Sequence, residues 1–326
     1  MRTFCRSTAL FVLVFFLFLG FGTAYGAKFP EKAVTLVVHA APGGGSDQFA
    51  RWIQATFDKY KLLPQPIVVE NKPGGAAAVS MAYVAGKKKD PHYLLTVTGV
   101  FLLTPLQGLS PVNYRVFTPI CNLSSDEHML IVNINSKFKS IKDVVDFAKT
   151  HPETVTVGGS FAGATESINN YRFEQAAGIK TKYVGFSGSN DGVVALLGGH
   201  IDITSGNPNE VMELVRAKKV RILGSLTEKR IPFLPDVPTV KEQGVNAVGL
   251  GMTRGIAAPG DIPEDARKTL EEAFSKLAKT EDYRKFHNDN MVVQAWMDSA
   301  TFGNFLEKKN GEYASLLKDM GLLKAK

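Results

Sequence analysis

The sequence contains very little cysteine: only Cys5 and Cys121 among its 326 residues. Cys5 lies in an N-terminal stretch that we expect to be removed, which leaves one thiol in the mature chain. A single thiol can form neither an intrachain disulfide nor a metal site built on several thiolates. We therefore expect Cys121 to act as a small buried apolar residue, and core packing to hold the fold together.

Signatures of several enzyme classes are missing as well. The six histidines show no pair at metal-ligand spacing, and there is no Gly-x-Ser-x-Gly nucleophile motif. The glycine-rich segment 41–47 lacks the Gly-Lys-Ser/Thr ending of a nucleotide-binding P-loop and the spacing of a dinucleotide-binding fold. We predict no catalytic residue, no cofactor and no metal, and we expect each histidine to be structural or exposed.

The charge balance is only mildly basic, with 38 Lys and Arg against 31 Asp and Glu and a net charge of +7. Removing the two arginines near the start lowers the net charge to +5. The basic residues are scattered, and the one run, Lys87–Lys89, precedes a turn. This pattern argues against a nucleic-acid partner, and we expect a monomer.

The N-terminus has the features of a secretory signal peptide over residues 1–26. Two arginines precede an apolar run at 9–21, and the small residues Ala24 and Gly26 follow. A run of about 13 residues is too short to span a bilayer, which needs about 20. We expect cleavage near Ala27 and a periplasmic protein, with an uncleaved anchor as the alternative.

Short apolar runs alternate with amphipathic segments, a pattern that predicts parallel sheets flanked by helices on both faces. Strands are expected at 34–38, 67–69, 94–97, 129–132, 155–157, 182–184, 201–203 and 220–223. Helices are expected from Ser46 or Asp47 as N-cap to Tyr60, and at 76–85, 140–149, 165–177, 190–197, 209–217, 263–277, 280–288 and 300–317. The chain length favours two lobes, and the part after 261 predicts helices without a new sheet.

Ligands of parallel sheets bind beyond the carboxyl ends of the strands, so the loops there are the candidate sites. Segments 41–47 and 158–165 share one construction: glycines lead into a helix start, whose free N–H groups favour anions. Segment 186–191 is a third candidate. Tight turns required by packing, or ordinary helix caps, are the alternative explanation. Asp47 as a general base is less favoured than Asp47 as a capping residue.

Several motifs together resemble the extracytoplasmic receptors of tripartite tricarboxylate transporters, the TctC-like or Bug family, over nearly the whole mature chain. They are Phe29-Pro30, Ala41–Asp47 with Ala50-Arg51, Val69–Gly75, Leu196–Asp202, Leu234–Val240 with Glu242 and Gly244, and Ala257–Gly260. Their order and spacing are far more specific than any single glycine loop.

This resemblance implies an α/β bilobal periplasmic-binding-protein fold (type II-like), with two mixed or parallel sheets flanked by helices and a cleft between them. It places residues 27–123 and 247–326 in lobe 1 and the inserted residues 124–246 in lobe 2. It also implies a small carboxylate ligand, delivered to membrane subunits of the transporter. The implied ligand-binding residues are Gly44, Gly45, Ser46, Asp47 and Gly75 from lobe 1, and Ser160, Ala164, Thr165, Ser187 and Asp191 from lobe 2.

The chain departs from the family pattern at Glu166, where a histidine is common, and at Met252–Gly255, where an aromatic residue is common. Arg254 is therefore a candidate partner for a distal ligand carboxylate. Two other functions stay open: a sensory receptor for a signalling partner, and an enzyme on the same bilobal fold. Sequence does not separate transport from sensing, because one closed surface can dock either partner.

Overall fold

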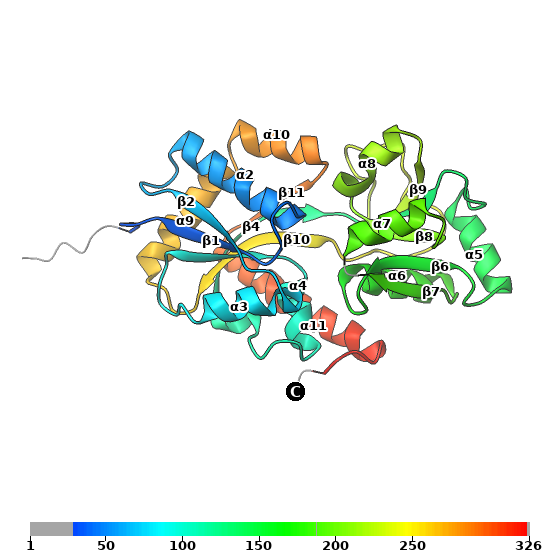
Figure 1. Cartoon of the computed structure of the whole chain (residues 1–326), viewed down its shortest axis with the longest axis horizontal. Coiled ribbons are helices and arrows are strands. Elements are labelled where there is room, and N and C mark those ends of the chain that lie inside the picture. Colours follow the sequence, from blue (N-terminus) through cyan, green and yellow to red (C-terminus); the bar gives the residue numbers. More distant parts are fainter. Residues whose placement is uncertain (1–28, 187, 325–326) are drawn as a thin grey trace, which may run out of the picture.

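The computed structural model describes residues 29–186 and 188–324, and it contains two β-sheets built from different parts of the chain (Figure 1). The predicted signal peptide, residues 1–26, lies outside the described residues. Within those two ranges no helix combines the length and apolar character needed to cross a membrane.

The first sheet has six strands in the order β11-β4-β10-β3-β1-β2. They are β1 (Val34–Val38), β2 (Ile67–Asn71), β3 (Tyr93–Val97), β4 (Phe117–Asp126), β10 (Met252–Pro259) and β11 (Val293–Met297). β1 pairs in parallel with β2 and β3, whereas β10 is antiparallel to both β3 and β4. The sheet is therefore mixed, and β10 brings a late segment of the chain between two early strands.

Helices cover both faces of this sheet, which explains its apolar strands. One face carries α2 (Gly45–Tyr60), α9 (Glu264–Leu277) and α10 (Glu281–Asn290); the other carries α3 (Ala78–Ala85), α4 (Val100–Leu106) and α11 (Ser299–Asp319). The period of two along β1 sends Leu36 to the first face and Val37 to the second, and both are fully buried.

The second sheet has five strands in the order β7-β6-β8-β5-β9, again mixed. They are β5 (Met129–Asn133), β6 (Thr156–Ser160), β7 (Lys182–Phe186), β8 (Ile203–Gly206) and β9 (Val220–Ser225). One face packs against α5 (Ile141–Thr150) and α6 (Thr165–Ala177), the other against α7 (Ser189–Leu197) and α8 (Pro208–Arg216).

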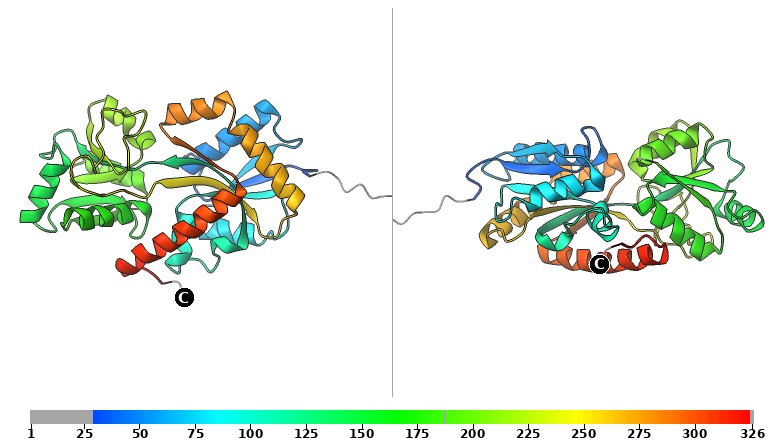
Figure 2. Two further views of the ribbon diagram at one scale, coloured as in Figure 1. Left: turned by 180° about the vertical axis from the view of Figure 1, so that it is seen from behind. Right: turned by 60° about the horizontal axis from the view of Figure 1, so that its bottom comes forward.

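The two sheets and their helices form two halves that lie side by side (Figure 2). α11 runs beneath the first sheet toward the second half, where Glu312 pairs with Arg172 of α6 at 2.8 Å. The predicted bilobal α/β fold is thus confirmed. The lobe boundaries at 123/124 and 246/247 stay a prediction; β4 itself runs on to Asp126, which still pairs with Met252 of β10.

Some elements differ from the sequence-based expectation. β4, β10 and β11 were not predicted, and β11 lies in the part expected to contain only helices. β10 reads Met-Thr-Arg-Gly-Ile-Ala-Ala-Pro, and its glycine, alanines and proline have weak strand propensity, so only its neighbours make it a strand. The N-cap expected at Ser46 or Asp47 was wrong, because α2 begins earlier, at Gly45, with Gly44 as N-cap.

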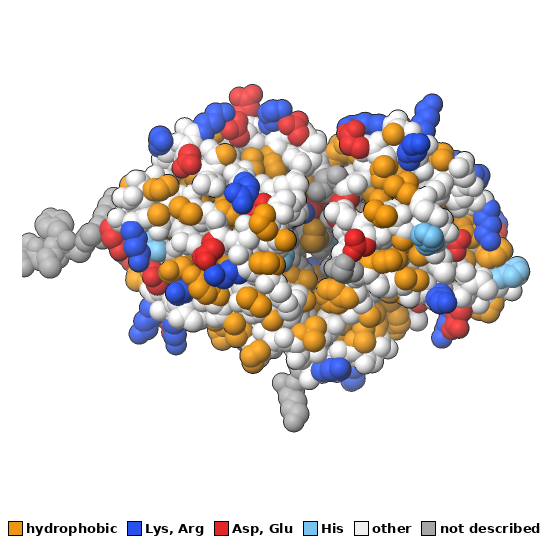
Figure 3. All heavy atoms as spheres, in the orientation of Figure 1, with side chains coloured by type: hydrophobic (Ala, Val, Ile, Leu, Met, Phe, Trp, Pro, Cys, Tyr) orange, Lys and Arg blue, Asp and Glu red, His pale blue; other side chains and the backbone are white. Residues whose placement is uncertain are grey.

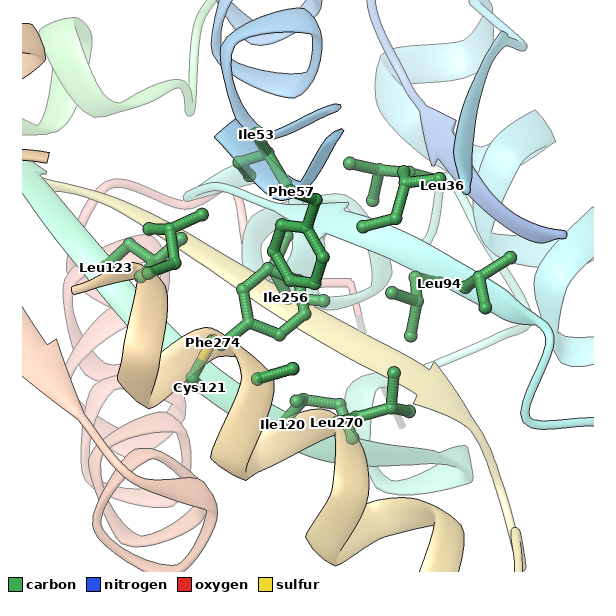
Figure 4. Packing of buried hydrophobic residues seen from close by; sticks show 14 of the residues in the cluster. Leu36, Ile53, Phe57, Leu94, Ile120, Cys121, Leu123, Ile256, Leu270 and Phe274 are labelled. Carbon is green, nitrogen blue, oxygen red and sulfur yellow. The ribbon is translucent and has the colours of Figure 1, made fainter. Parts of the chain in front are cut away.

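The core of the first lobe joins residues from both ends of the chain (Figure 4). Phe57 of α2 packs edge-on against Phe274 of α9, with ring centroids 4.9 Å apart. Cys121 lies fully buried among them, and burial raises the pKa of its thiol well above the ordinary value. The prediction that Cys121 is a small buried core residue is confirmed.

Gly255 allows β10 to pass closely over its neighbours. A Cβ at this position would lie 2.4 Å from Cζ of Phe302 and 2.9 Å from the Cys121 carbonyl oxygen. We predict that Gly255→Ala lowers the free energy of unfolding by about 1–3 kcal/mol, since overpacking forces the backbone to shift. Chemical denaturation measures the loss. Gly311→Ala on α11 is the control, because no atom lies within 4 Å of its added Cβ; equal losses in both variants contradict the prediction.

Candidate functional site

A cleft of about 360 Å³ lies between the two halves, where strand ends and helix starts of both sheets converge. Figure 3 shows the surface hollowed between them. The first half contributes His39, Ala40, Gly45, Ser46, Thr98, Gly99, Val100 and Met252; the second contributes Ser160, Phe161, Ala164, Thr165, Glu166, Gly188, Ser189, Asn190, Asn207 and Glu210.

Five of the ten residues expected to bind a ligand line this cleft. They are Gly45, Ser46, Ser160, Ala164 and Thr165. The first two open α2 in the first half. In the second half, Ser160 ends β6, Ala164 is the N-cap of α6 and Thr165 is its first residue. Two glycine-containing loops, one from each sheet, therefore face one hollow. That they bind the ligand stays a prediction.

The other expected residues lie elsewhere. Gly44 directly precedes the lining residue Gly45 as the N-cap of α2. Gly75 is exposed in the turn before α3, and Asp191 is exposed in the first turn of α7; neither lines the cleft. Ser187 lies outside the described residues.

Asp47 is buried behind the cleft and holds its first loop in shape. Its Oδ2 accepts hydrogen bonds from the Gly43 N–H at 2.8 Å and from Arg51 Nε at 2.9 Å, and its Oδ1 accepts from Asn71 Nδ2 at 2.9 Å. The hydrogen bond from Arg51 is the main reason that the pKa of Asp47 falls to about 2. Asp47 thus orders the loop before α2 rather than lining the cleft.

Helices α2, α6 and α7 all begin at the cleft, and none has a side-chain cap. Their N-caps are Gly44, Ala164 and Gly188, each with an extended backbone and no capping hydrogen bond from its side chain. Side-chain caps, which were the alternative explanation for these loops, are therefore absent from these three helix starts. Uncapped helix starts offer N–H groups and the positive end of the helix dipole to an anion.

His39 follows β1 and lines the cleft, which the sequence analysis missed by treating each histidine as structural or exposed. Its Nδ1 lies 3.2 Å from Thr96 Oγ1, and its Nε2 lies 3.3 Å from Thr98 Oγ1 and 3.4 Å from Ser46 Oγ. Burial, assisted by the nearby Arg254 charge, lowers the pKa of His39 to about 4. The imidazole is therefore neutral near pH 7. Its place directly after the first strand was the available signal.

Two glutamates line the second half of the cleft, and sequence reasoning had noted only Glu166, as a departure from the family. Glu166 Oε1 accepts from Ser160 Oγ at 3.1 Å. Glu210 accepts from Ser189 Oγ at 2.6 Å and, through Oε2, from the Asn207 N–H at 3.1 Å. Burial raises the pKa of both carboxyl groups.

Arg254 does not line the cleft. It is 6% exposed and directs Nε and Nη2 to Oδ2 of Asp126, with Nε at 2.8 Å. Asn207 Nδ2 of the second half reaches the same oxygen at 3.2 Å. An internal carboxylate thus accepts from Nε and Nη2 of Arg254. The guanidinium lies next to Gly45 of the cleft, where an added Cβ would lie 3.5 Å from Nη2, and its pairing with a ligand carboxylate stays a prediction.

Comparison with known proteins assigns the chain to a family. The model of the tripartite tricarboxylate transporter family receptor matches residues 49–322. The chain belongs to this receptor family. One relative is a UPF0065 protein from Cupriavidus necator, 27% identical over 93% of this chain and 91% of the relative.

Solved structures share the fold of this receptor. A Rhodopseudomonas palustris protein with adipate is similar with a TM-score of 0.81 and 23% identity, covering 90% of this chain and 98% of that one. MatC from the same organism, with bound malate, has a TM-score of 0.75 and 24% identity, over 89% of this chain and all of its own. The predicted family is confirmed.

We predict that Asp47→Ala destabilises the receptor by about 1–3 kcal/mol, because the Gly43 N–H and the Asn71 side chain lose a buried acceptor. The difference from the unaltered protein should shrink as pH falls from about 4 toward 2, where Asp47 itself becomes protonated. Denaturation curves across this pH range test both points. Asp58→Ala, exposed on the same helix, is the control; the proposal for Asp47 fails if the two variants behave alike.

The lowered pKa of His39 predicts a pH dependence of stability. Between the unfolded pKa of 6.5 and the folded value of about 4, the unfolded chain binds more protons at this site, so acidification through this window should favour unfolding. Comparing the protein with His39→Gln isolates this term: only the histidine form should show it. An imidazole NMR titration of His39 with a midpoint near 6.5 would contradict the expectation.

Proposed function

We propose that this chain is a periplasmic solute receptor that captures a small carboxylate between its two lobes and delivers it to a membrane transporter of the tripartite tricarboxylate type. The observation that carries the proposal is the set of uncapped helix starts, from both lobes, around one cleft. Membership of the receptor family supports it. So do two similar solved structures, one with bound malate and one with adipate.

Ligand capture follows from donors on facing walls. Ser46 and the first N–H groups of α2 stand on one wall, with Ser160, Thr165 and the start of α6 on the other. Backbone and hydroxyl donors stabilise an anion without bringing a full positive charge into the site. Because neither wall surrounds the ligand alone, binding favours the arrangement in which the lobes are close.

The lobes already touch at one edge of the cleft, which limits how they move. A Cβ on Gly99 would lie 2.9 Å from Thr165 Oγ1, and Gln107 Nε2 donates to the Gly163 carbonyl at 3.1 Å. These contacts join the two caps of α4, the N-cap Gly99 and the C-cap Gln107, to the start of α6 and to the β6–α6 loop. We therefore expect the lobes to close by rotating about these contacts, which stay in place. The bound ligand then adds further contacts between the two lobes.

Secretion and transport complete the proposal. The signal-peptide pattern of residues 1–26 supports a periplasmic location of the mature chain, which a receptor of this kind requires. The chain then acts as a binding protein rather than an enzyme, and it presents its closed form to the membrane subunits.

The test is a thermal-shift screen of the mature protein against mono-, di- and tricarboxylates, with neutral sugars and simple amines as comparison. A ligand at 100 times its Kd should stabilise by about 2.7 kcal/mol. We expect an acid to give this stabilisation. The carboxylate assignment fails if only sugars or amines raise the Tm.

Single-lobe variants test whether the ligand bridges the lobes. Ser46→Ala and Thr165→Val each remove one hydroxyl from opposite walls, and each should weaken binding by about tenfold or more, since a hydrogen bond to a charged group contributes about 1.5–3 kcal/mol. Calorimetric titration measures the change. Thr150→Val, exposed at the end of α5, is the control. A loss confined to one lobe would contradict capture between two walls.

A further inference from the structure

The charges that line the cleft are unusual for a site that takes an anion. The residues that the structure describes along it include two carboxyl groups, Glu166 and Glu210, and no lysine or arginine. His39, which also lines the cleft, has a neutral imidazole near pH 7 because its pKa is about 4. The formal charge contributed by the described lining is therefore negative when both glutamates are ionised.

Neither glutamate has a basic partner. Among the described residues, Glu166 and Glu210 take part in no ion pair, and their hydrogen-bond donors are hydroxyl and backbone groups. The guanidinium of Arg254 donates to Asp126 through Nε and Nη2, and its charge also acts on Glu210 without forming an ion pair with it. His128, buried close to Glu210, has a lowered pKa because of burial. Buried carboxylates normally have a cation or shift their pKa, and the pKa of both glutamates is raised.

Helix capping accounts for only one of the two carboxyl oxygens of Glu210. Its Oε2 accepts from the Asn207 N–H at the start of α8, while its Oε1 faces the Ser189 hydroxyl at the cleft. Glu166, 9% exposed, stands in the first turn of α6. These two helices thus bring two carboxyl groups to the same wall.

Asn207 provides an independent observation at this wall. It lines the cleft and is 3% exposed. Its side chain forms a capping box with Glu210 at the start of α8, in which Oδ1 faces the Glu210 N–H without a hydrogen bond of good geometry. An unpaired buried acceptor is costly. A donor reaching it from the cleft would remove this cost. Asn207 and the two glutamates would therefore be satisfied by the same kind of ligand group, one that is positively charged and rich in N–H donors.

We propose that the ligand of this receptor carries a cationic nitrogen, such as an ammonium group, in addition to its carboxylate. The carboxylate is held at the start of α2 by main-chain N–H groups and Ser46, and the cationic nitrogen lies against Glu166, Glu210 and Asn207. This rests on the proposed function and names its substrate class: zwitterionic amino carboxylates rather than plain di- or tricarboxylates.

The same wall would reject a plain dicarboxylate. Its second carboxylate would meet two acidic side chains with no basic residue between them, and like charges in a desolvated site repel strongly. An amino carboxylate instead forms charge-assisted hydrogen bonds at that position. The discrimination follows from residues of α6 and α8, while α2 serves either ligand.

Matched ligands test the proposal by calorimetry on the mature protein. 4-Aminobutanoate, pentanoate and glutarate share a three-methylene spacer and end in ammonium, methyl and carboxylate groups; L-glutamate against glutarate and L-aspartate against succinate extend the comparison to α-amino acids. We expect at least one aminated member to bind about tenfold or more tightly than its unaminated counterpart, as for a buried charge pair.

Glu166→Gln and Glu210→Gln remove each charge with little change in shape. Either should abolish most of the preference for the aminated ligand and improve the relative binding of the dicarboxylate. Glu213→Gln is the matched control, because Glu213 is exposed on α8 and pairs with Arg216; it should leave the preference unchanged. Melting temperatures of the unliganded variants establish that each is folded.

Three results would overturn the inference, and only the third would also overturn the proposed function. Equal or tighter binding of every unaminated counterpart rejects the cationic nitrogen but leaves carboxylate capture intact. A preference for the aminated ligand that survives both glutamine variants rejects the role of the glutamates. If no acid of either kind binds while amines without a carboxylate do, the proposed function fails as well.

Discussion

The buried ion pair between Arg254 and Asp126 is the interaction on which the site depends. It joins β10 to the end of β4, where the chain leaves the first sheet, and Asn207 ties the second half to the same carboxylate. Removing one partner from such a pair leaves an uncompensated buried charge, which is strongly destabilising. The pair also affects the electrostatics around it: the Arg254 charge lowers the pKa of His39, and the guanidinium donates to Asp126 through Nε and Nη2.

Much of the fold could be predicted from the sequence because its strands and helices have strong periodic patterns. β1 lies at the predicted 34–38 and α6 at the predicted 165–177, and both are flanked by glycine-rich turns. β10 could not be predicted in this way, since its alanines and Gly255 gain strand character only from β3 and β4 on either side. Antiparallel insertion of a late segment is a tertiary event that local propensity does not contain.

The candidate site was predictable to the same degree and for related reasons. Loops with glycine before a helix gave Gly45, Ser46, Ser160, Ala164 and Thr165, which share the cleft. The hydrogen bonds by which Asp47 orders its loop depend on residues far apart in the chain. The same is true of the position of Glu166 and Glu210 on one wall of the cleft. Spacing within one segment does not carry that information, and the neutral His39 depends on burial in the folded protein.

The helix starts without side-chain caps have a consequence for how such a receptor diversifies. Main-chain N–H groups at α2, α6 and α7 exist whatever side chains surround them, so point substitutions cannot delete them as they delete a lysine. An inherited scaffold of this kind keeps a general affinity for anions while single exchanges on the opposite wall retune what else is accepted. Under the proposed function, a single substitution would then be enough to change which ligand is bound, because the main-chain donors for the anion stay in place.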